Sequence, residues 1–345
     1  MHSRYFAAGG IALYLCDKWY GSVNSSWLFT PSSLTYAEET GISTMTIPRP
    51  AWLNVDAGQY FFVNIPQISL DQWHPISWSG SLNGDIVFRI KNQATTSSKS
   101  SSLQQMFSTS TTFISHSNNP VAALPRWSEA FAIIADSARF QRMPMPVVRL
   151  HGPFGHSPFH EYDALLLFAG GIGITPIMSL VIDLFINVHQ GIPIRPQQVV
   201  LVWMAQQVDL FFMYADVFNA IANLQKSAEY PVFIIKLFCT RGGIINNSSS
   251  VSVMHSQSMM SAPLLVSSRD ISDSSSGSYA GPQDLPIGSG ISLDYSRCNF
   301  PELFESFSRS RSTLAAVCGP PQMAQEVSVY AKLFDCEFHS EEFTF

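Results

Sequence analysis

The chain has 345 residues, of which 46% are hydrophobic and only 13% are charged, whereas soluble domains usually carry about 25% charged residues. This composition excludes a disordered chain, and the length suits two domains. The net charge of −6 argues against a nucleic-acid-binding face, because such faces cluster Lys and Arg against phosphates. The low charge and the mean hydropathy of +0.12 raise instead the question of a membrane.

The apolar run from Tyr5 to Cys16 is too short to cross a bilayer, which takes about 20 residues. No cleavage site of small residues follows it, so it does not resemble a signal peptide. Three interpretations stay open: the end of a spanning helix whose beginning the chain lacks, an interfacial segment, or a buried one.

The cysteines form no CxxC pair and show no zinc spacing; they are Cys16, Cys239, Cys298, Cys318 and Cys336. The sequence therefore predicts no metal site and favours a reduced, cytosolic environment.

Short strands are predicted throughout the first half of the chain. They are rich in Val, Ile, Phe and Tyr and are bounded by Gly, Pro, Asn or Asp; they cover Thr44–Ile47, Gln59–Ile65, Asp85–Lys91 and Pro146–Leu150. One helical pattern, Glu129–Phe140, follows Ser128, which is suited to N-cap it. Short strands without long helices between them predict a small antiparallel barrel or sandwich.

Strands and helices alternate in the second half. Buried strands are predicted at Ala164–Ala169, Val199–Met204, Val232–Cys239 and Thr313–Cys318, and helices at Thr175–Val188, Val217–Leu224 and Pro321–Leu333. This order predicts a doubly wound parallel sheet. The fold class is thus α/β plus all-β, with the antiparallel barrel first.

Two segments rich in Ser, Thr and Asn interrupt these patterns, at 93–124 and 244–290. They lack apolar periodicity, so we expect long disordered surface insertions. They also dilute the charge of the whole chain, which partly explains the low charged fraction without a membrane.

The strongest local signal is the run Gly170-Gly171-Ile172-Gly173-Ile174-Thr175-Pro176, between a buried strand and a helix. Glycines let a backbone approach a phosphate, and a helix N-terminus offers unpaired N–H groups and the positive end of its dipole. The run departs from GxGxxG, because Pro176 takes the last position. By itself it indicates a dinucleotide site or a plain structural turn.

Taken alone, each of four further motifs has a purely structural interpretation. His74-Pro75-Ile76-Ser77 is a turn with a packed histidine, Trp127-Ser128 is a helix cap, and Gly152-Pro153-Phe154-Gly155 is an interdomain turn. Cys318-Gly319-Pro320 is a buried thiol before a helix. The last motif lies at the C-terminal edge of the predicted parallel sheet, where doubly wound folds bind ligands.

Taken in order, these motifs resemble the flavin dehydrogenase module of ferric-chelate reductases and NADPH oxidases. The resemblance runs from about Leu13 to Phe345, apart from the two Ser-rich segments. It implies a membrane-proximal segment at 1–20, an FAD-binding barrel domain at 34–160 and an NAD(P)-binding domain at 161–345.

The resemblance implies an FAD site in the first half. His74, Pro75, Ile76 and Ser77 resemble the first FAD motif, with Ile76 in place of the usual Phe and the Ser77 hydroxyl near the flavin N5. Lys91 resembles a basic residue near the flavin phosphates, and Ser128 a hydroxyl that meets the pyrophosphate. Gly152 and Gly155 are expected to serve as both turn and site.

The resemblance implies an NADPH site in the second half. Gly170, Gly171, Gly173, Thr175 and Pro176 resemble the pyrophosphate loop, and Cys318, Gly319 and Pro320 resemble the motif close to the nicotinamide. Arg241 and Arg297 resemble positions at the adenosine end, where a guanidinium can clamp a 2′-phosphate; an exposed, solvated Arg is an equal alternative. The oxidases carry Cys-Arg-Asp after the second sheet strand, whereas this chain reads Ala205-Gln206-Gln207, so the choice between NADPH and NADH stays open.

The chain ends in aromatic residues, Phe343 and Phe345, which resemble the family's C-terminus over the isoalloxazine; core packing is the alternative. Together with Ser77 and Cys318, Phe345 is a predicted catalytic residue. The 244–290 segment lies where plant-type ferric-chelate reductases also carry an insert, which favours them.

The implied function is hydride transfer from NADPH to FAD, followed by single-electron transfer through membrane haem to ferric chelate. The segment Ala12-Leu13-Tyr14-Leu15-Cys16 resembles the exit from the last membrane helix, which places the module on the cytosolic side of a membrane. The haem helices are absent, so the chain is a truncated gene model, a fragment, or a dehydrogenase that docks to a separate haem protein. A superoxide-producing oxidase fragment and a non-catalytic relic are the alternatives.

Overall fold

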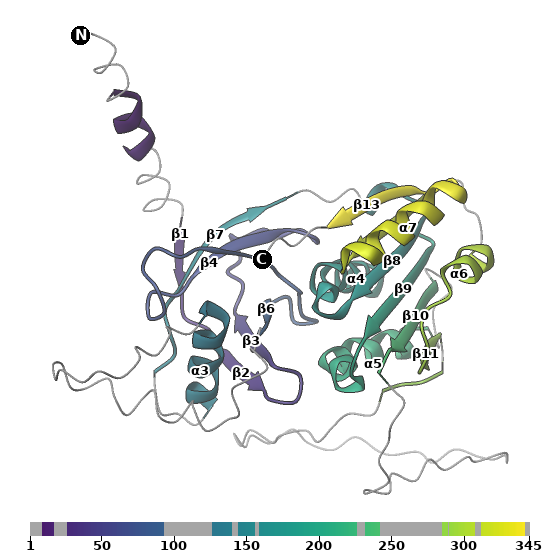
Figure 1. Cartoon of the computed structure of the whole chain (residues 1–345), viewed down its shortest axis with the longest axis horizontal. Helices are drawn as coiled ribbons and strands as arrows, with labels where there is room; N and C mark the ends of the chain where they lie inside the picture. Colours follow the sequence, from purple (N-terminus) through teal and green to yellow (C-terminus); the bar gives the residue numbers. More distant parts are fainter. Residues whose placement is uncertain are drawn as a thin grey trace, which may run out of the picture.

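The computed structural model describes residues 9–16, 26–92, 126–139, 144–155, 159–225, 232–241, 285–288, 290–307 and 312–341. Two bodies lie side by side in it, an antiparallel β part built from the first half of the chain and an α/β part built from the second (Figure 1). The predicted fold class is therefore confirmed.

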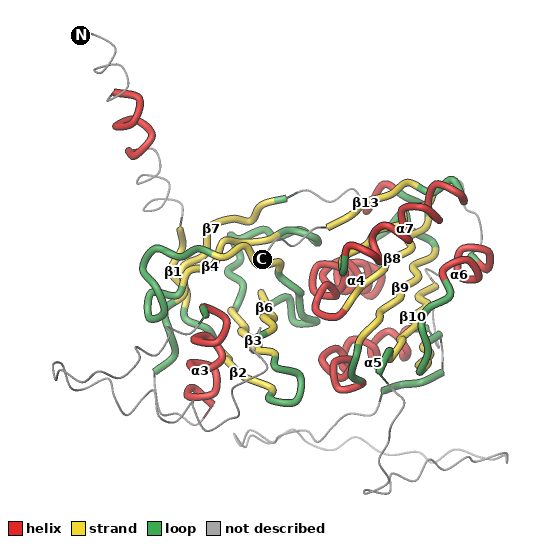
Figure 2. Tube along the Cα trace, viewed as in Figure 1, coloured by secondary structure: helices red, strands yellow, loops and turns green. Residues whose placement is uncertain are grey.

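The first body consists of two antiparallel sheets. One has the order β1-β7-β4-β5, with β1 (Ser26–Phe29), β7 (Val148–Phe154), β4 (Tyr60–Asn64) and β5 (His74–Ser77); the other has the order β2-β3-β6, with β2 (Ser33–Ala37), β3 (Ile42–Ile47) and β6 (Ile86–Lys91). Their inward side chains alternate with outward ones, as strand geometry requires. Met45, Phe61, Phe88 and Leu150 meet in one buried core. Helix α3 (Trp127–Arg139) lies beside β2 and β3 (Figure 2) and adds Phe131 to that core.

The second body is a six-stranded parallel sheet. Its order is β11-β10-β9-β8-β12-β13, with β8 (Ala164–Gly170), β9 (Gln198–Ala205), β10 (Val232–Cys239), β11 (Ile291–Asp294), β12 (Thr313–Cys318) and β13 (Glu337–Glu341). Leu165 and Leu167 of β8 pack into one core, whereas Leu166 and Phe168 pack into another on the opposite face. Because both faces are covered, the strand reads as an unbroken apolar run.

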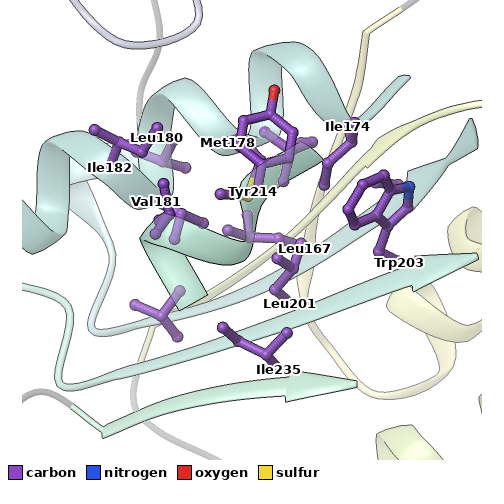
Figure 3. Packing of buried hydrophobic residues seen from close by; sticks show 14 of the residues in the cluster. Leu167, Ile174, Met178, Leu180, Val181, Ile182, Leu201, Trp203, Tyr214 and Ile235 are labelled. Carbon is purple, nitrogen blue, oxygen red and sulfur yellow. The ribbon is translucent and has the colours of Figure 1, made fainter. Parts of the chain in front are cut away.

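Helices cover the two faces of this sheet. The core around Leu165 receives α4 (Ile174–His189) and α5 (Ala215–Leu224), and Figure 3 shows Ile174, Met178 and Val181 of α4 among its side chains. The core around Phe168 receives α6 (Phe300–Ser306) and α7 (Pro321–Leu333). A short 3₁₀ turn, η2 (Gly171–Gly173), joins β8 to α4; it stands at the C-terminal edge of the sheet.

Three local interpretations are corrected by the structure. The helix begins at Trp127, so Ser128 lies within its first turn and does not cap it. The backbone N–H of Arg126 instead donates a hydrogen bond to the Glu129 carboxylate at 3.1 Å. His74–Ser77 forms strand β5 and not a turn, because it pairs with β4. β7 begins at Val148 and continues through Phe154, so Gly152-Pro153 lies inside a strand.

The 93–124 segment lies outside the described residues, as does most of 244–290. The end of the second segment is nevertheless not a surface insertion. Leu285 packs against the sheet core, and the Gly290 carbonyl accepts a hydrogen bond from the Ile235 N–H at 2.8 Å. The Ser-rich composition concealed this return to the sheet.

Among the described residues, one helix is long and apolar enough to cross a membrane, Gly171–His189. Its apolar window is 67% buried within the protein, as expected of a helix that packs on the central strands. A separate helix over residues 9–16 exposes Ile11, Leu13 and Leu15.

Candidate functional site

A cleft of about 1480 Å³ is lined by residues from both bodies. The β body contributes β5, the end of β6 and the start of α3, and the α/β body contributes the C-terminal ends of its strands. The residues from the sequence motifs that line it are His74, Pro75, Ile76, Ser77, Lys91, Ser128, Gly170, Gly171, Thr175, Arg297 and Pro320. Ligands of doubly wound sheets bind at this edge.

The cleft is locally basic in an acidic protein. Its lining contains the cations Arg89, Lys91, Arg126 and Arg297 against the anions Glu39 and Glu326, whereas the whole chain has a net charge of −6. Clustered guanidinium and ammonium groups attract and orient phosphates. The lining therefore suits an anionic ligand.

Two aromatic rings form one wall of the cleft on the β side. His74 lies 4.3 Å from Trp127, centroid to centroid, and Trp127 stacks on Phe131 at 5.5 Å. Among the described residues, His74 Nε2 and Trp127 Nε1 are buried and lack a hydrogen-bond partner. Burial lowers the pKa of His74, so its imidazole is neutral near pH 7. An indole N–H can only donate, and that of Trp127 lies beneath the cleft surface without an acceptor.

The other predicted FAD residues surround these rings. Ser77 is 5% exposed, Lys91 is exposed at the end of β6, and Ser128 lies in the first turn of α3. The structure thus brings the first FAD motif, Lys91 and Ser128 to the same part of the cleft.

Gly152 and Gly155 do not reach the cleft. Gly152 is packed beside β4, where a Cβ atom would stand 3.1 Å from both the Phe61 ring and the Tyr60 carbonyl. The Gly155 carbonyl accepts a hydrogen bond from Gln59 Nε2 at 3.1 Å. Both glycines serve the packing of β7 against β4.

The two nucleotide-side motifs meet at adjacent strand ends. A Cβ atom at Gly170 would lie 2.5 Å from the Pro320 ring, and one at Gly319 would lie 3.1 Å from Gly170 Cα. Only glycines allow this approach. The pairing of β8 with β12 therefore joins the glycine turn and the Cys318 motif into one surface, although they are far apart in the sequence.

Gly171 and Thr175 shape the turn itself. Gly171 has φ +55°, a conformation that favours glycine, and a Cβ atom there would meet nothing within 4 Å. The Thr175 hydroxyl donates to the Ile172 carbonyl at 3.3 Å. Gly173 and Pro176 are buried beneath this turn. The turn thus presents backbone to the cleft with no side chain in front of Gly171.

Cys318 lies below the surface of the site. Its side chain is 0% exposed, and a Cβ atom at Gly173 would come 3.0 Å from its Sγ. Burial, followed by the charge of Glu341, raises the pKa of the thiol well above its usual range. The thiol therefore stays protonated, and it supports the turn from behind.

Two arginines were predicted at the adenosine end. Arg297 lines the main cleft and an adjoining hollow of about 500 Å³ with Gln322, Glu326 and Tyr330. Arg241 is exposed and does not line the cleft, although its neighbour Thr240 does. Gln206 and Gln207 also line it, so the place of the oxidases' Arg holds amides.

Phe343 and Phe345 lie outside the described residues. The strand that leads to them ends at Glu341, which pairs in register with Cys318. The chain therefore leaves β13 at the edge of the sheet that lines the cleft.

Arg89 is a lining residue that the sequence reasoning missed. Its guanidinium donates to Ser79 Oγ and to the Met213 carbonyl, at 3.3 Å for the latter, and lies 4.2 Å from the centre of the Tyr214 ring. It thereby links the β body to the α/β body. An arginine that follows the buried run Ile86–Phe88 is the signal that could have identified it.

The comparisons with known proteins agree with this geometry. Residues 31–157 match the family described as FAD-binding domain, and residues 162–332 match the family described as ferric reductase NAD binding domain. Respiratory burst oxidase homolog protein B of Solanum tuberosum is 21% identical over 98% of this chain and 40% of its own length. Ferric reduction oxidase 7, chloroplastic, of Arabidopsis thaliana is 28% identical over 59% of this chain and 25% of its own length. The chain thus spans well under half of these relatives.

Solved structures share the fold. The cytochrome b5 reductase domain of Ulva prolifera nitrate reductase has a TM-score of 0.53 at 10% identity, over 93% of this chain and 99% of its own. A ferredoxin NADP+ reductase from Neisseria gonorrhoeae with bound FAD and NADP has a TM-score of 0.50 at 13% identity, over 92% of this chain and 98% of its own.

Proposed function

Since the chain belongs to the ferric reductase and NADPH oxidase family, of which it comprises the FAD-binding and NAD-binding domains, we propose that it passes electrons from NADPH to a membrane haem partner and on to ferric chelate. It is an oxidoreductase module with FAD and NAD(P) as cofactors. The single observation that carries the proposal is the cleft in which the FAD motif, the glycine turn and Pro320 of the Cys318 motif line one space.

FAD, when bound, would supply the chemistry of hydride acceptance and single-electron release. The residues of the cleft provide binding and orientation. The rings of His74 and Trp127 line the β side of the cleft and are assigned to the flavin nucleotide. Lys91 and Arg126, which also line the cleft, are assigned to its phosphates. Ser77 supplies a nearly buried hydroxyl at the end of β5.

The glycine turn is assigned to the pyrophosphate of NADPH. The open face of Gly171 and the N-terminus of α4 supply backbone N–H groups to an anion. Arg297 is assigned to the 2′-phosphate, because it is the predicted arginine that lines the cleft. We place the nicotinamide beside Gly319 and Pro320, with the buried Cys318 thiol behind them.

A membrane partner is part of the proposal. The exposed apolar side chains of the helix over residues 9–16 support attachment of this end to a bilayer, with the module on its cytosolic side. The haem that would receive the electrons is expected in that partner or in a part of the protein beyond this chain.

Superoxide production is the second candidate function. It is favoured by several respiratory burst oxidase homologs that match 97 to 98% of this chain. Others match 52%, and ferric reduction oxidases match 55 to 59%. Ferric reduction is favoured by the family described for residues 162–332 and by the place of the 244–290 segment. Supplying a haem partner and measuring ferric reduction against superoxide separates the two.

One spectrum tests the module itself. We expect purified protein to be yellow, with an absorbance band at about 450 nm, as for other bound flavins. This band should bleach when NADPH is added without oxygen. A colourless protein that takes up no FAD would indicate the non-catalytic relic, for which Ile76 and Gln206 are the motivation. A yellow protein that NADPH does not bleach would contradict the assignment of the nucleotide half.

A further inference from the structure

Trp203 is a buried residue of β9 whose indole ring reaches the glycine turn. The side chain is 0% exposed, and its Nε1–H donates to the carbonyl oxygen of Gly171 at 2.9 Å. Trp203 does not line the cleft, whereas Gly171 and Ile172 do. A ring in the core therefore holds a backbone atom of the candidate phosphate site from behind.

This hydrogen bond fixes the plane of one peptide group. The Gly171 carbonyl and the Ile172 N–H belong to the same planar trans unit, so they point in opposite directions. With the carbonyl held on Trp203, the Ile172 N–H points away from the core. It belongs to the first turn after β8, where N–H groups lack partners within the helix.

We propose that Trp203 is a positioning residue for NADPH: its indole N–H holds the Gly171 carbonyl toward the core, so that the Ile172 N–H faces the pyrophosphate. The inference rests on the proposed function, because it takes the turn as the pyrophosphate site. Gly171 is the position where such control is required. It has no side chain, and a Cβ atom added there would meet nothing within 4 Å, so no packed side chain restrains its peptide plane.

The indole is itself held rigidly. Its ring packs edge to face against Phe211 at 5.0 Å and Tyr214 at 5.9 Å, and Figure 3 shows Trp203 at the end of the buried cluster beside Leu201. Tyr214 in turn lies under the guanidinium of Arg89. The turn is thereby connected through two buried rings to the β body on the other side of the cleft.

Losing this hydrogen bond should weaken the binding of a pyrophosphate ligand. A rotated plane would direct the Gly171 carbonyl oxygen, a partial negative charge, toward the phosphates and withdraw the N–H. The variant would lose a hydrogen bond to a charged group, so we expect the Kd for a pyrophosphate ligand to rise about tenfold or more.

The test is equilibrium titration of the FAD-loaded full chain by calorimetry, with two ligands. NADP+ contains the pyrophosphate, and adenosine 2′-monophosphate lacks it. Trp203→Phe should weaken NADP+ by about tenfold and leave adenosine 2′-monophosphate unchanged. A general loss of folding would weaken both ligands.

Trp78→Phe is the matched control. Trp78 is also buried, and its Nε1–H also donates to a backbone carbonyl, that of Asp56 at 3.0 Å. It does not line the cleft, so its variant should bind NADP+ as the wild type does. A second variant addresses the smaller ring of phenylalanine: benzothienylalanine at position 203 keeps the shape of tryptophan and lacks the N–H.

The outcomes are distinguishable. Equal NADP+ affinity in wild type, Trp203→Phe and the benzothienylalanine protein would overturn the inference while the proposed function stands. A wild-type protein that binds neither ligand would overturn the proposed function and, with it, this role of Trp203. Weakened NADP+ binding in the benzothienylalanine protein alone would support the inference even where Trp203→Phe fails to fold.

Discussion

Gly173 lies directly against the backbone of Cys318: a Cβ atom at Gly173 would stand 2.4 Å from the Cys318 carbonyl oxygen. Backbone atoms of β12 cannot yield to such a contact as a flexible side chain would. The glycine turn and the Cys318 motif are consequently one packed unit, and the shape of the nucleotide site depends on both.

Gly173→Ala should therefore cost more stability than Gly171→Ala. The first forces a methyl group into packed backbone and is expected to cost about 2 kcal/mol or more. The second places a methyl group in open space and carries only the strain of φ +55°, about 1 kcal/mol. Urea unfolding of the two variants measures the difference, and equal losses would contradict the packing.

Trp127→Phe should reduce FAD retention and spare the fold. The variant keeps a ring between His74 and Phe131 but removes part of the indole that lines the cleft, so we expect an FAD affinity that is weaker by about several-fold. Flavin absorbance after dialysis reports the retention. Undiminished retention would indicate that this ring does not contact the cofactor.

The stability of the protein should depend on pH through two histidines with opposite signs. His74 has a lowered pKa because of burial, so the unfolded chain binds its proton first and stability falls as the pH drops below about 6.5. His160 has a raised pKa because it hydrogen-bonds Asp183, so its contribution is present below about 6.5 and is lost as the pH rises through that raised pKa.

His74→Gln and His160→Gln separate the two contributions. Thermal unfolding of the full chain between about pH 5.5 and 8 should show a shallower acid loss in His74→Gln than in the wild type. His160→Gln should differ most from the wild type at the acid end. Parallel profiles for all three proteins would contradict the assignment.

Cys318 should resist alkylation in the native state. Its pKa is raised by burial, and the reactive species of a cysteine is the thiolate. Iodoacetamide at about pH 8, followed by mass spectrometry, should label the exposed Cys16 and leave Cys318 and the buried Cys239 unlabelled. Rapid native labelling of Cys318 would show that the turn opens.

Deleting Phe343–Phe345 should change access of the nicotinamide to the flavin. Strand β13 ends at Glu341 beside Cys318, so the removed residues follow a strand that ends next to the proposed nicotinamide site. Stopped-flow reduction of the flavin by NADPH measures the effect, with FAD content as the control. An unchanged rate would remove this role from the C-terminus.

Much of the fold was predictable because its strands and helices carry strong patterns. The run Ala164–Ala169 and the helix after it are recognisable, since both faces of β8 are buried. Strands β1, β2, β11 and β13 have only four or five residues each, too few for a period to appear. Their existence depends on neighbours that only the folded sheet provides.

The site was predictable as a set of motifs and not as a set of contacts. The sequence could not show that the His74 ring lies against Trp127, because a long Ser-rich segment separates them. Nor could it separate Arg297, which lines the cleft, from Arg241, which does not, since both follow sheet strands. Gly152 and Gly155 share a motif with site residues of the family, yet here they pack β7 against β4.

The register of β13 with β12 has a practical consequence for handling the protein. Glu341, the last residue of β13, lies beside Cys318, next to the space proposed for the nicotinamide. Under that proposal, an affinity tag or reporter that follows this strand would compete with the cofactor. Purification handles should therefore be carried elsewhere in kinetic work, and a C-terminal reporter becomes a sensor of whether that space is open.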